Sequence, residues 1–203
     1  MLSKIGKDIT MAVFIAMLIT STIPYQVQAQ QSNYNYAPYF TANNSYVSIN
    51  DDPNLRLEQF SVSVWFKTNM TNNKEIAMIV NKGGFGSGDG SSITDMNYGI
   101  WLTGTNQGVA GIVQAGFEDS NGNNYFIRSK NTYNDNNWHY VVLTYDKSVL
   151  KLYIDNVLVA SKNTNAIPDY NWNTPLVIGK DSNTNKRYFN GYIDEVRVYN
   201  RAL

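Results

Sequence analysis

The segment Trp138-His-Tyr-Val-Val-Leu-Thr-Tyr145 decides the interpretation of the fold, because β-branched and aromatic residues fill it from end to end. After the turn Asp146-Lys-Ser148, the segment Leu150-Lys-Leu-Tyr-Ile154 alternates large aliphatic side chains with other residues. Asp155-Asn156 then has the chemistry of a two-residue hairpin turn, since both residues tolerate a positive φ. Val157-Leu-Val-Ala160 returns from this turn. The whole stretch therefore predicts neighbouring antiparallel strands.

Segments of the same kind recur on both sides of this stretch. Phe60-Ser-Val-Ser-Val-Trp-Phe-Lys67 places Phe60, Val62, Val64 and Phe66 on one face, and Trp65 makes its second face partly buried as well. Further strands are expected at 46–49, 75–80, 98–103, 109–115, 125–129, 176–178 and 192–199. No segment after the N-terminal region carries a 3.6-residue apolar stripe over 12 residues. Many short strands between turn residues predict an all-β fold, an antiparallel β-sandwich.

The first 29 residues have the three-part layout of a secretory signal peptide. Lys4 and Lys7 precede the apolar run 11–19, and Val27-Gln-Ala29 offers small residues before a cleavage point. The run is about half as long as the ~20 residues that a membrane span needs; the alternative is an uncleaved anchor helix. We therefore expect a signal peptide at 1–29, a flexible lead at 30–39 and one domain at 40–203. The mature chain is expected to have no membrane span and to be secreted or on the cell surface.

Composition excludes several classes of function. The 203 residues carry 16 basic and 16 acidic side chains, so nothing favours nucleic acid or an anionic membrane as a partner. Without cysteine there is no disulfide, thiolate catalysis, zinc–cysteine site or iron–sulfur cluster. The 28 asparagines and 15 tyrosines make a neutral, amide-rich surface that can hydrogen-bond sugars or proteins.

Two stretches resemble a known family. Residues 138–146 and 150–161 resemble the paired central strands of laminin G-like domains, which have the concanavalin A-like jelly-roll fold. Leu176-Val-Ile-Gly-Lys180 and Phe189-Asn-Gly-Tyr-Ile-Asp-Glu-Val-Arg-Val-Tyr-Asn-Arg-Ala-Leu203 resemble its closing segment. The resemblance implies a jelly roll over nearly the whole mature chain. It does not specify the function, because this fold hosts lectins, adhesion modules, glycosidases and accessory domains.

The same resemblance implies a structural calcium ion near the opening loop and the closing aspartate. Its candidate ligands here are Asp194 and Asn43, the latter in the loop 41–45. That loop departs from the family, because Thr41 and Ser45 stand where aspartates are common, which weakens the expected site. The alternative is that the Asp194 carboxylate binds backbone N–H groups at a bulge, which the interrupted alternation of strand 192–199 also predicts.

Catalytic residues are not expected. Glycoside hydrolysis needs two carboxylates placed together, but the acidic pairs Asp51-Asp52, Glu118-Asp119 and Asp194-Glu195 are sequence neighbours, which point to opposite faces of a regular strand. The one histidine, His139, lies inside a strand pattern, and no Gly-x-Ser-x-Gly motif accompanies it. A packed or partly exposed strand histidine is therefore expected instead of a catalytic base.

The segment Asp169-Tyr-Asn-Trp-Asn173 is the candidate ligand-binding loop. It lies between Pro168 and Pro175 and alternates aromatic rings with amides, so Tyr170, Asn171, Trp172 and Asn173 are the candidate binding residues. The alternative is that Trp172 fixes the loop to the sandwich. The other three tryptophans, Trp65, Trp101 and Trp138, lie in strands and are expected in the core.

These observations predict a secreted or cell-surface, non-catalytic module that recognises an extracellular glycan or protein. The alternatives are a structural or adhesion protein without a small-ligand site, and a domain related to glycoside hydrolases. The oligomeric state stays open.

Overall fold

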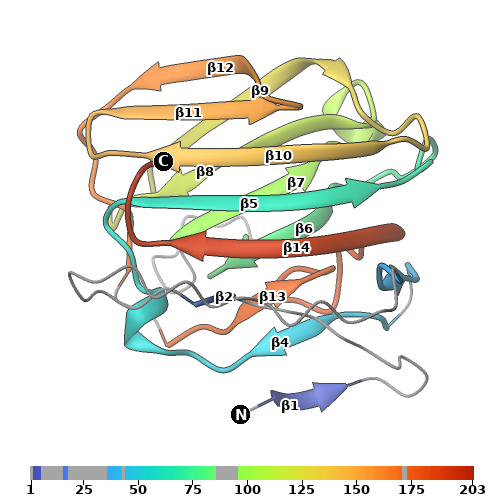
Figure 1. Cartoon of the computed structure of the whole chain (residues 1–203), viewed down its shortest axis with the longest axis horizontal. Coiled ribbons are helices and arrows are strands. Elements are labelled where there is room, and N and C mark those ends of the chain that lie inside the picture. Colours follow the sequence, from blue (N-terminus) through green and yellow to red (C-terminus); the bar gives the residue numbers. More distant parts are fainter. Residues whose placement is uncertain (1, 6–15, 18–35, 43, 86–95, 171–172) are drawn as a thin grey trace.

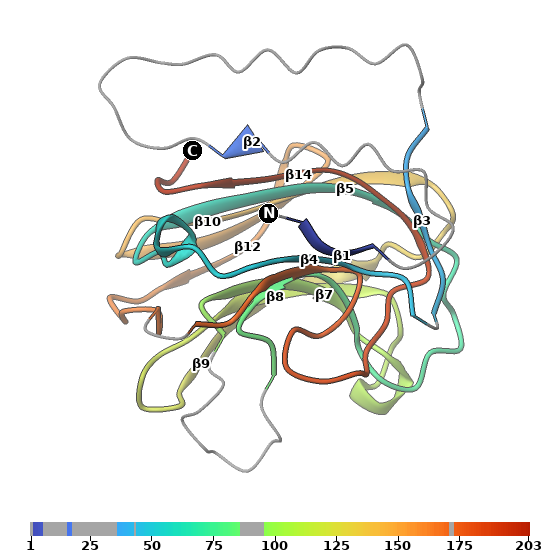
Figure 2. The same cartoon turned by 90° about the horizontal axis from the view of Figure 1, so that it is seen from below.

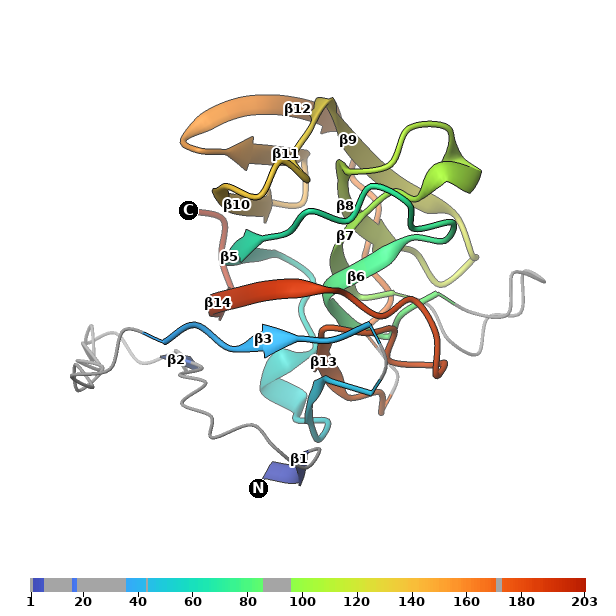
Figure 3. The same cartoon turned by 90° about the vertical axis from the view of Figure 1, so that its right-hand side faces the viewer.

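The computed structural model describes residues 2–5, 16–17, 36–42, 44–85, 96–170 and 173–203. In this part of the chain, β-strands are joined by turns and by two short 3-10 segments, η1 (Pro53–Leu55) and η2 (Thr105–Gln107). The strands form two sheets that pack face to face, as Figures 2 and 3 show from two directions. The predicted all-β sandwich is therefore confirmed.

One layer, here named the β5 sheet, lies in front in Figure 1. Its strand order is β12-β11-β10-β5-β14-β2, and β3 also pairs with β14. The strands are β2 (Ala16–Met17), β3 (Tyr39–Phe40), β5 (Phe60–Lys67), β10 (Trp138–Tyr145), β11 (Val149–Ile154), β12 (Val157–Asn163) and β14 (Gly191–Tyr199). All pairs are antiparallel except β14 with β2.

The other layer, the β7 sheet, has the order β1-β4-β13-β6-β7-β8-β9 and is antiparallel throughout. Its strands are β1 (Leu2–Ile5), β4 (Val47–Ile49), β6 (Ala77–Lys82), β7 (Tyr98–Leu102), β8 (Ile112–Glu118), β9 (Asn124–Thr132) and β13 (Leu176–Ile178). β1 and β2 come from the predicted signal segment. Each sheet keeps six antiparallel strands without them.

The core follows from the alternation in the strands. Phe60, Val62, Val64 and Phe66 of β5 have no exposed surface, as their shared face predicted. They meet inward side chains of the opposite sheet such as Ile100. Burying each such side chain stabilises the fold by roughly 1.5–3 kcal/mol, so this inner layer fixes which face of every strand points outward.

One turn and one bulge have the predicted geometry. Asp155 and Asn156 both have positive φ, at 51° and 66°, and join β11 to β12. The predicted bulge in β14 lies between Asp194 and Arg197, where the register against β5 shifts and Glu195 has a φ of 48°.

The expectation that Trp65 and Trp138 belong to the core is wrong. They are 36% and 39% exposed, because their positions in β5 and β10 alternate with inward residues and point away from the opposite sheet. Trp101 is buried as expected, at 1% exposed, but it packs in a separate cluster. Over the residues just given as described, no helix is long and apolar enough to span a bilayer.

Candidate functional site

A second apolar cluster covers the outer face of the β7 sheet. Ile100 and Leu102 of β7 point into the core, so Trp101 between them points outward. There it packs with Ile76, Met78 and Met96, and with the partly buried rings of Phe85 and Phe126. Buried aromatic side chains on the outer face of a sheet need a local covering, and loops supply it here.

A hollow of about 380 Å³ opens beside this cluster. Its apolar wall is formed by Ile76, Phe85, Trp101 and Phe126. Its polar lining comes from Glu75, Asn106, Gln107, Gln114 and Arg187. The size lies within the ~300–1,000 Å³ range of small-ligand pockets, and apolar walls with a few polar groups are typical of such pockets.

The three aromatic rings of the hollow hold one another in place. The ring centroids of Phe85 and Trp101 are 4.9 Å apart with their planes at 85°, and those of Trp101 and Phe126 are 4.9 Å apart at 82°. Phe85 and Phe126 also meet, at 5.8 Å and 76°. Edge-to-face contacts of this kind stabilise each pair by about 0.5–1.5 kcal/mol. The wall is therefore preorganised.

The position of Arg187 is fixed from three directions. Its guanidinium forms an ion pair with Asp181, a residue with no exposed surface. The guanidinium carbon also lies 5.2 Å from the centroid of the Phe85 ring, which is a cation–π distance. Its backbone carbonyl accepts a hydrogen bond from Met78 N–H at 3.0 Å. A cationic donor is thus held at the edge of the hollow.

Hydrogen bonds also fix the rim formed by η2. Thr105 N–H donates to the Asn73 carbonyl at 2.8 Å, and Asn106 N–H donates to the Lys74 carbonyl at 3.0 Å. Gln107 Oε1 accepts from Gly104 N–H at 2.9 Å, which leaves its amide N–H₂ unused by that contact. The rim residues Asn106 and Gln107 therefore stand on a rigid turn.

Three polar groups of the hollow have no hydrogen-bond partner within the described chain. They are the Glu75 carboxylate and the side-chain amides of Asn106 and Gln114. Gln114 lies on β8 directly opposite Trp101 of β7, so its amide stands beside the aromatic wall. These groups can donate to and accept from a bound molecule. Among the lining residues that the structure describes, Glu75 has the single carboxylate, and none has a hydroxyl or thiol nucleophile.

Part of the predicted binding loop 169–173 is held against the rest of the domain by hydrogen bonds. Tyr170 hydrogen-bonds the Glu58 carboxylate, which raises the pKa of the Tyr170 hydroxyl. Asn173 Oδ1 accepts from Arg56 Nη2 at 2.5 Å, and Asp169 is 3% exposed. Asn171 and Trp172 lie outside the described residues. The structure therefore does not bring Tyr170 or Asn173 to the hollow, and a binding role for the loop stays a prediction.

Of the two predicted calcium ligands, the structure describes Asp194 alone, so the site stays a prediction. Asn43 is outside the described residues, while Thr41 Oγ1 and Ser45 Oγ hydrogen-bond each other at 2.7 Å. Asp194 Oδ1 accepts the N–H of Glu195 at 2.9 Å, as the alternative role at the bulge predicted. Burial raises the pKa of the Asp194 carboxyl, although this hydrogen bond lowers it. The described part has no group of three or more His, Asp or Glu side chains fit for a metal ion.

His139 is a packed strand histidine, as expected. Its Nδ1 lies 2.8 Å from Asp155 Oδ2 and its Nε2 lies 3.0 Å from Asp135 Oδ1. Burial lowers the pKa of His139, but the hydrogen bonds to Asp155 and Asp135 raise it, and the net pKa is above the ordinary value. When it is protonated, the imidazole can donate to both carboxylates and so link the two turns.

A laminin G family model, described as the concanavalin A-like lectin/glucanases superfamily, matches residues 41–203. The chain belongs to this superfamily. The match covers the stretches on which the resemblance rested. No curated protein shows a significant match to the chain.

Solved structures of the concanavalin A-like fold match most of the chain. A putative carbohydrate binding protein from Bacteroides ovatus ATCC 8483 is 18% identical with a TM-score of 0.63, over 82% of this chain and 44% of that one. The CBM40 of Ruminococcus gnavus IT-sialidase, bound to α2,3-sialyllactose, has the same identity and TM-score over 82% of this chain and 90% of its own. The botulinum neurotoxin serotype D binding domain is 17% identical with a TM-score of 0.58, over 81% of this chain and 38% of that one. This chain thus spans less than half of the first and third. At this identity the likeness concerns the fold.

Sequence reasoning missed the hollow because its lining comes from segments far apart in the chain. Glu75 precedes β6, Gln107 belongs to η2, and Arg187 precedes β14. The signal that could have indicated it is the pair Trp101 and Gln114, each of which alternates with aliphatic residues of its strand and so faces outward.

Proposed function

We propose that this chain is an extracytoplasmic, non-catalytic module that binds a glycan in the hollow on the β7 sheet. One observation carries the proposal: a single cavity of about 380 Å³ is lined by three fixed aromatic rings, an anchored guanidinium, and amide and carboxylate groups that have no partner among the described residues. A sugar ring has apolar C–H faces and a rim of hydroxyl groups. It therefore needs both an aromatic wall and hydrogen-bonding groups beside that wall.

The structural relatives support the class of ligand. Two of them are a putative carbohydrate binding protein and a CBM40 module bound to sialyllactose. Both share the fold of this chain, and modules of this fold reach different ligands through the groups on their faces and rims.

The carboxylates support a binding role over hydrolysis. Glycoside hydrolases place two carboxyl groups about 5–9.5 Å apart across the bond that is cleaved, whereas Glu75 is the single described carboxylate lining the hollow. Asp119 Oδ1 instead accepts the backbone N–H groups of Asn121 and Asn123, both at 2.9 Å. Asp51 pairs with Lys82 and Arg56. These acids stabilise the fold.

A glycan array followed by calorimetry with the best ligand tests the proposal. Gln114→Ala removes an amide that has no described structural partner, so we expect affinity to fall about tenfold, equivalent to about 1.4 kcal/mol, without loss of stability. Glu75→Gln should change affinity in the same direction. The matched control is Asn163→Ala, an exposed amide at the end of β12, which should leave affinity unchanged.

Other outcomes separate the alternatives. If Gln114→Ala and Glu75→Gln bind as tightly as the wild type, the hollow is not the site. If no glycan binds and an extracellular protein does, the module recognises protein. Polysaccharide turnover that is lost with Glu75→Gln would instead favour the glycoside hydrolase alternative. Trp172→Ala on the same array tests the loop 169–173: a loss of binding there would extend the site to that loop.

Calcium binding by Asp194 is kept as a separate proposal that follows from the family resemblance. An ion that binds only the folded state must raise the melting temperature. A rise on adding calcium to chelated protein, absent in Asp194→Asn, would support the proposal. A melting temperature that does not respond to calcium would remove it.

A further inference from the structure

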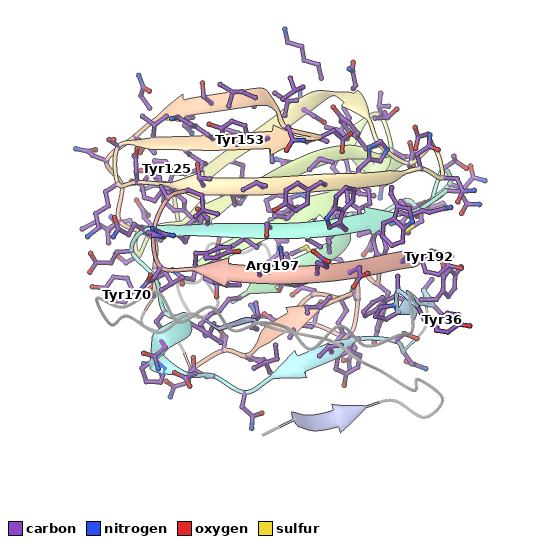
Figure 4. All side chains as sticks on the ribbon, in the orientation of Figure 1. Tyr36, Tyr125, Tyr153, Tyr170, Tyr192 and Arg197 are labelled. Carbon is purple, nitrogen blue, oxygen red and sulfur yellow. The ribbon has the colours of Figure 1, made fainter. Side chains whose placement is uncertain are left out.

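Five aromatic side chains gather at one end of the outer face of the β5 sheet. We name them the aromatic face: Tyr39 of β3, Trp65 of β5, Trp138 and Tyr140 of β10, and Tyr192 of β14. The register brings them into adjacent rows. Tyr39 is opposite Tyr192, Trp65 is opposite Tyr140, and both Trp138 and Tyr192 are opposite Lys67. The residues between them, such as Phe66 and Ile193, point into the core. Figure 4 looks onto this sheet and labels Tyr192 at the start of β14.

The rings touch one another and still reach solvent. The ring centroids of Tyr39 and Tyr192 are 4.9 Å apart, those of Trp138 and Tyr192 are 5.9 Å apart, and those of Trp65 and Tyr140 are 5.0 Å apart. The exposed fractions are 47% for Tyr39, 37% for Tyr192, and 36% and 39% for the tryptophans. Each ring is therefore held by its neighbours while part of its surface stays open.

Polar groups lie among the rings. Lys67 stands between Trp138 and Tyr192, and Asp194 stands opposite Trp65 on β14. The Lys67 ammonium and the hydroxyls of Tyr140 and Tyr192 make no hydrogen bond to another described residue. One positive and one negative side chain leave this region without net charge. It offers donors and acceptors to a neutral ligand.

The composition of the face indicates what kind of ligand fits it. Its large exposed apolar side chains are all Trp or Tyr, whereas the exposed aliphatic ones, Val109, Val157, Leu158, Ile167 and Leu203, lie elsewhere. A membrane-binding surface would add aliphatic residues and a basic excess. Flat rings with hydroxyl, ammonium and carboxylate groups between them instead match sugar rings, which stack through C–H groups and hydrogen-bond through hydroxyls.

We propose that the aromatic face is a second glycan-binding surface, which takes consecutive neutral sugar units of an extended polysaccharide. Four neighbouring strands, β3, β14, β5 and β10, contribute to it, and with about 4.8 Å between strands it spans roughly 14 Å, which is longer than one sugar ring. It lies on the outer face of one sheet, and the hollow lies on the outer face of the other. Because the two sheets pack face to face (Figure 3), the two sites lie on opposite sides of the sandwich. This proposal extends the proposed function, but it depends on different residues.

Affinity gel electrophoresis in four neutral linear polysaccharides, namely cellulose derivatives, xylan, mannan and β-1,3-glucan, tests it. We expect at least one polymer to retard the wild type. Trp138→Ala and Tyr192→Ala should each weaken that retardation about tenfold, and Trp138→Phe should restore part of it, because a ring is what the site needs. The matched control is Tyr153→Ala on β11 of the same sheet, labelled in Figure 4, which should bind within twofold of the wild type.

The two proposals fail in different ways. If Gln114→Ala abolishes binding to every glycan while Trp138→Ala and Tyr192→Ala bind as the wild type does, the aromatic face is refuted and the hollow stands. If the reverse holds, the hollow is refuted and the aromatic face stands. A wild type that no polymer retards also overturns the second surface. So does a dimer in solution that Trp138→Ala dissociates, because the face would then contact a second copy.

Discussion

Among single residues, His139 forms the contact that responds most directly to pH. Its ring lies between Asp135, in the turn before β10, and Asp155, in the turn between β11 and β12. The proton on the ring therefore links two turns of the β5 sheet.

The sign of this linkage gives a prediction. The pKa of folded His139 is raised above 6.5, so its contribution to stability is complete below about pH 6.5 and is lost as pH rises through the folded pKa. The pKa of Asp135 is lowered to about 2, first by the N–H of Asn137 and then by His139. Its contribution is present above pH 3.8 and is lost as pH falls towards 2. We expect the free energy of unfolding in urea to decline on both sides of roughly pH 4–6.5. His139→Gln should remove the decline on the alkaline side. An identical slope in both proteins above pH 6.5 would contradict the assignment.

Two serines of β5 should change the free energy of unfolding in opposite directions when each is replaced by alanine. Ser63 Oγ is buried without a hydrogen-bond partner in the described structure, whereas Ser61 Oγ donates to the Arg201 carbonyl at 2.8 Å and accepts from Leu203 N–H at 3.0 Å. An unsatisfied buried hydroxyl costs about 1–3 kcal/mol. We therefore expect Ser63→Ala to raise the free energy of unfolding by about 1 kcal/mol and Ser61→Ala to lower it by a similar amount. Two destabilised variants would show that Ser63 has a partner.

Among the elements, the start of β14 depends on close approach to β5. A Cβ atom at Gly191 would lie 2.3 Å from the Lys67 carbonyl oxygen, and the φ of Gly191 is 142°. We expect Gly191→Ala to lower the free energy of unfolding by about 2–3 kcal/mol. Gly122→Ala is the control, since Gly122 also has a positive φ, 77°, but its Cβ would meet nothing within 4 Å. It should cost roughly 1 kcal/mol. If chemical denaturation gave equal losses of unfolding free energy for both variants, the backbone angle, and not the contact with Lys67, would determine the loss.

The strands themselves could largely be predicted from the sequence. Period-two alternation gave β5 and β10 with their observed bounds, since an inward face of Phe and Val has one stable placement. The same alternation did not predict that Trp65 and Trp138 lie on the solvent-facing side, because a large aromatic residue can occupy either face of a strand. The burial of Lys82 could not be predicted either, because a lysine at the end of a strand suggests exposure. Lys82 is nevertheless 1% exposed, and its Nζ donates to Asp51 Oδ1 at 2.6 Å.

In the whole molecule, the described core cluster begins at Phe40 and ends at Val198. Of residues 36–39, the only ones before Phe40 whose side chains the structure describes, none belongs to this cluster. A chain that starts at Tyr36 should therefore fold to the same circular dichroism spectrum and melt within a few degrees of the full chain. A large loss of melting temperature would show that β1 or β2 stabilises the sandwich beyond its edge hydrogen bonds. The family of the chain could be recognised from its closing motif, but the hollow could not, because its groups come from strands and loops of the β7 sheet that are far apart in the sequence.

The placement of the tryptophans gives the molecule two built-in optical reporters. Trp101 is shielded beside the hollow, whereas Trp65 and Trp138 are partly open on the opposite layer. A water-soluble quencher such as iodide reaches the second pair and not the first. In a Trp172→Phe variant, which removes the one tryptophan outside the described residues, emission that survives quenching therefore reports on one side of the sandwich, and emission that quenching removes reports on the other.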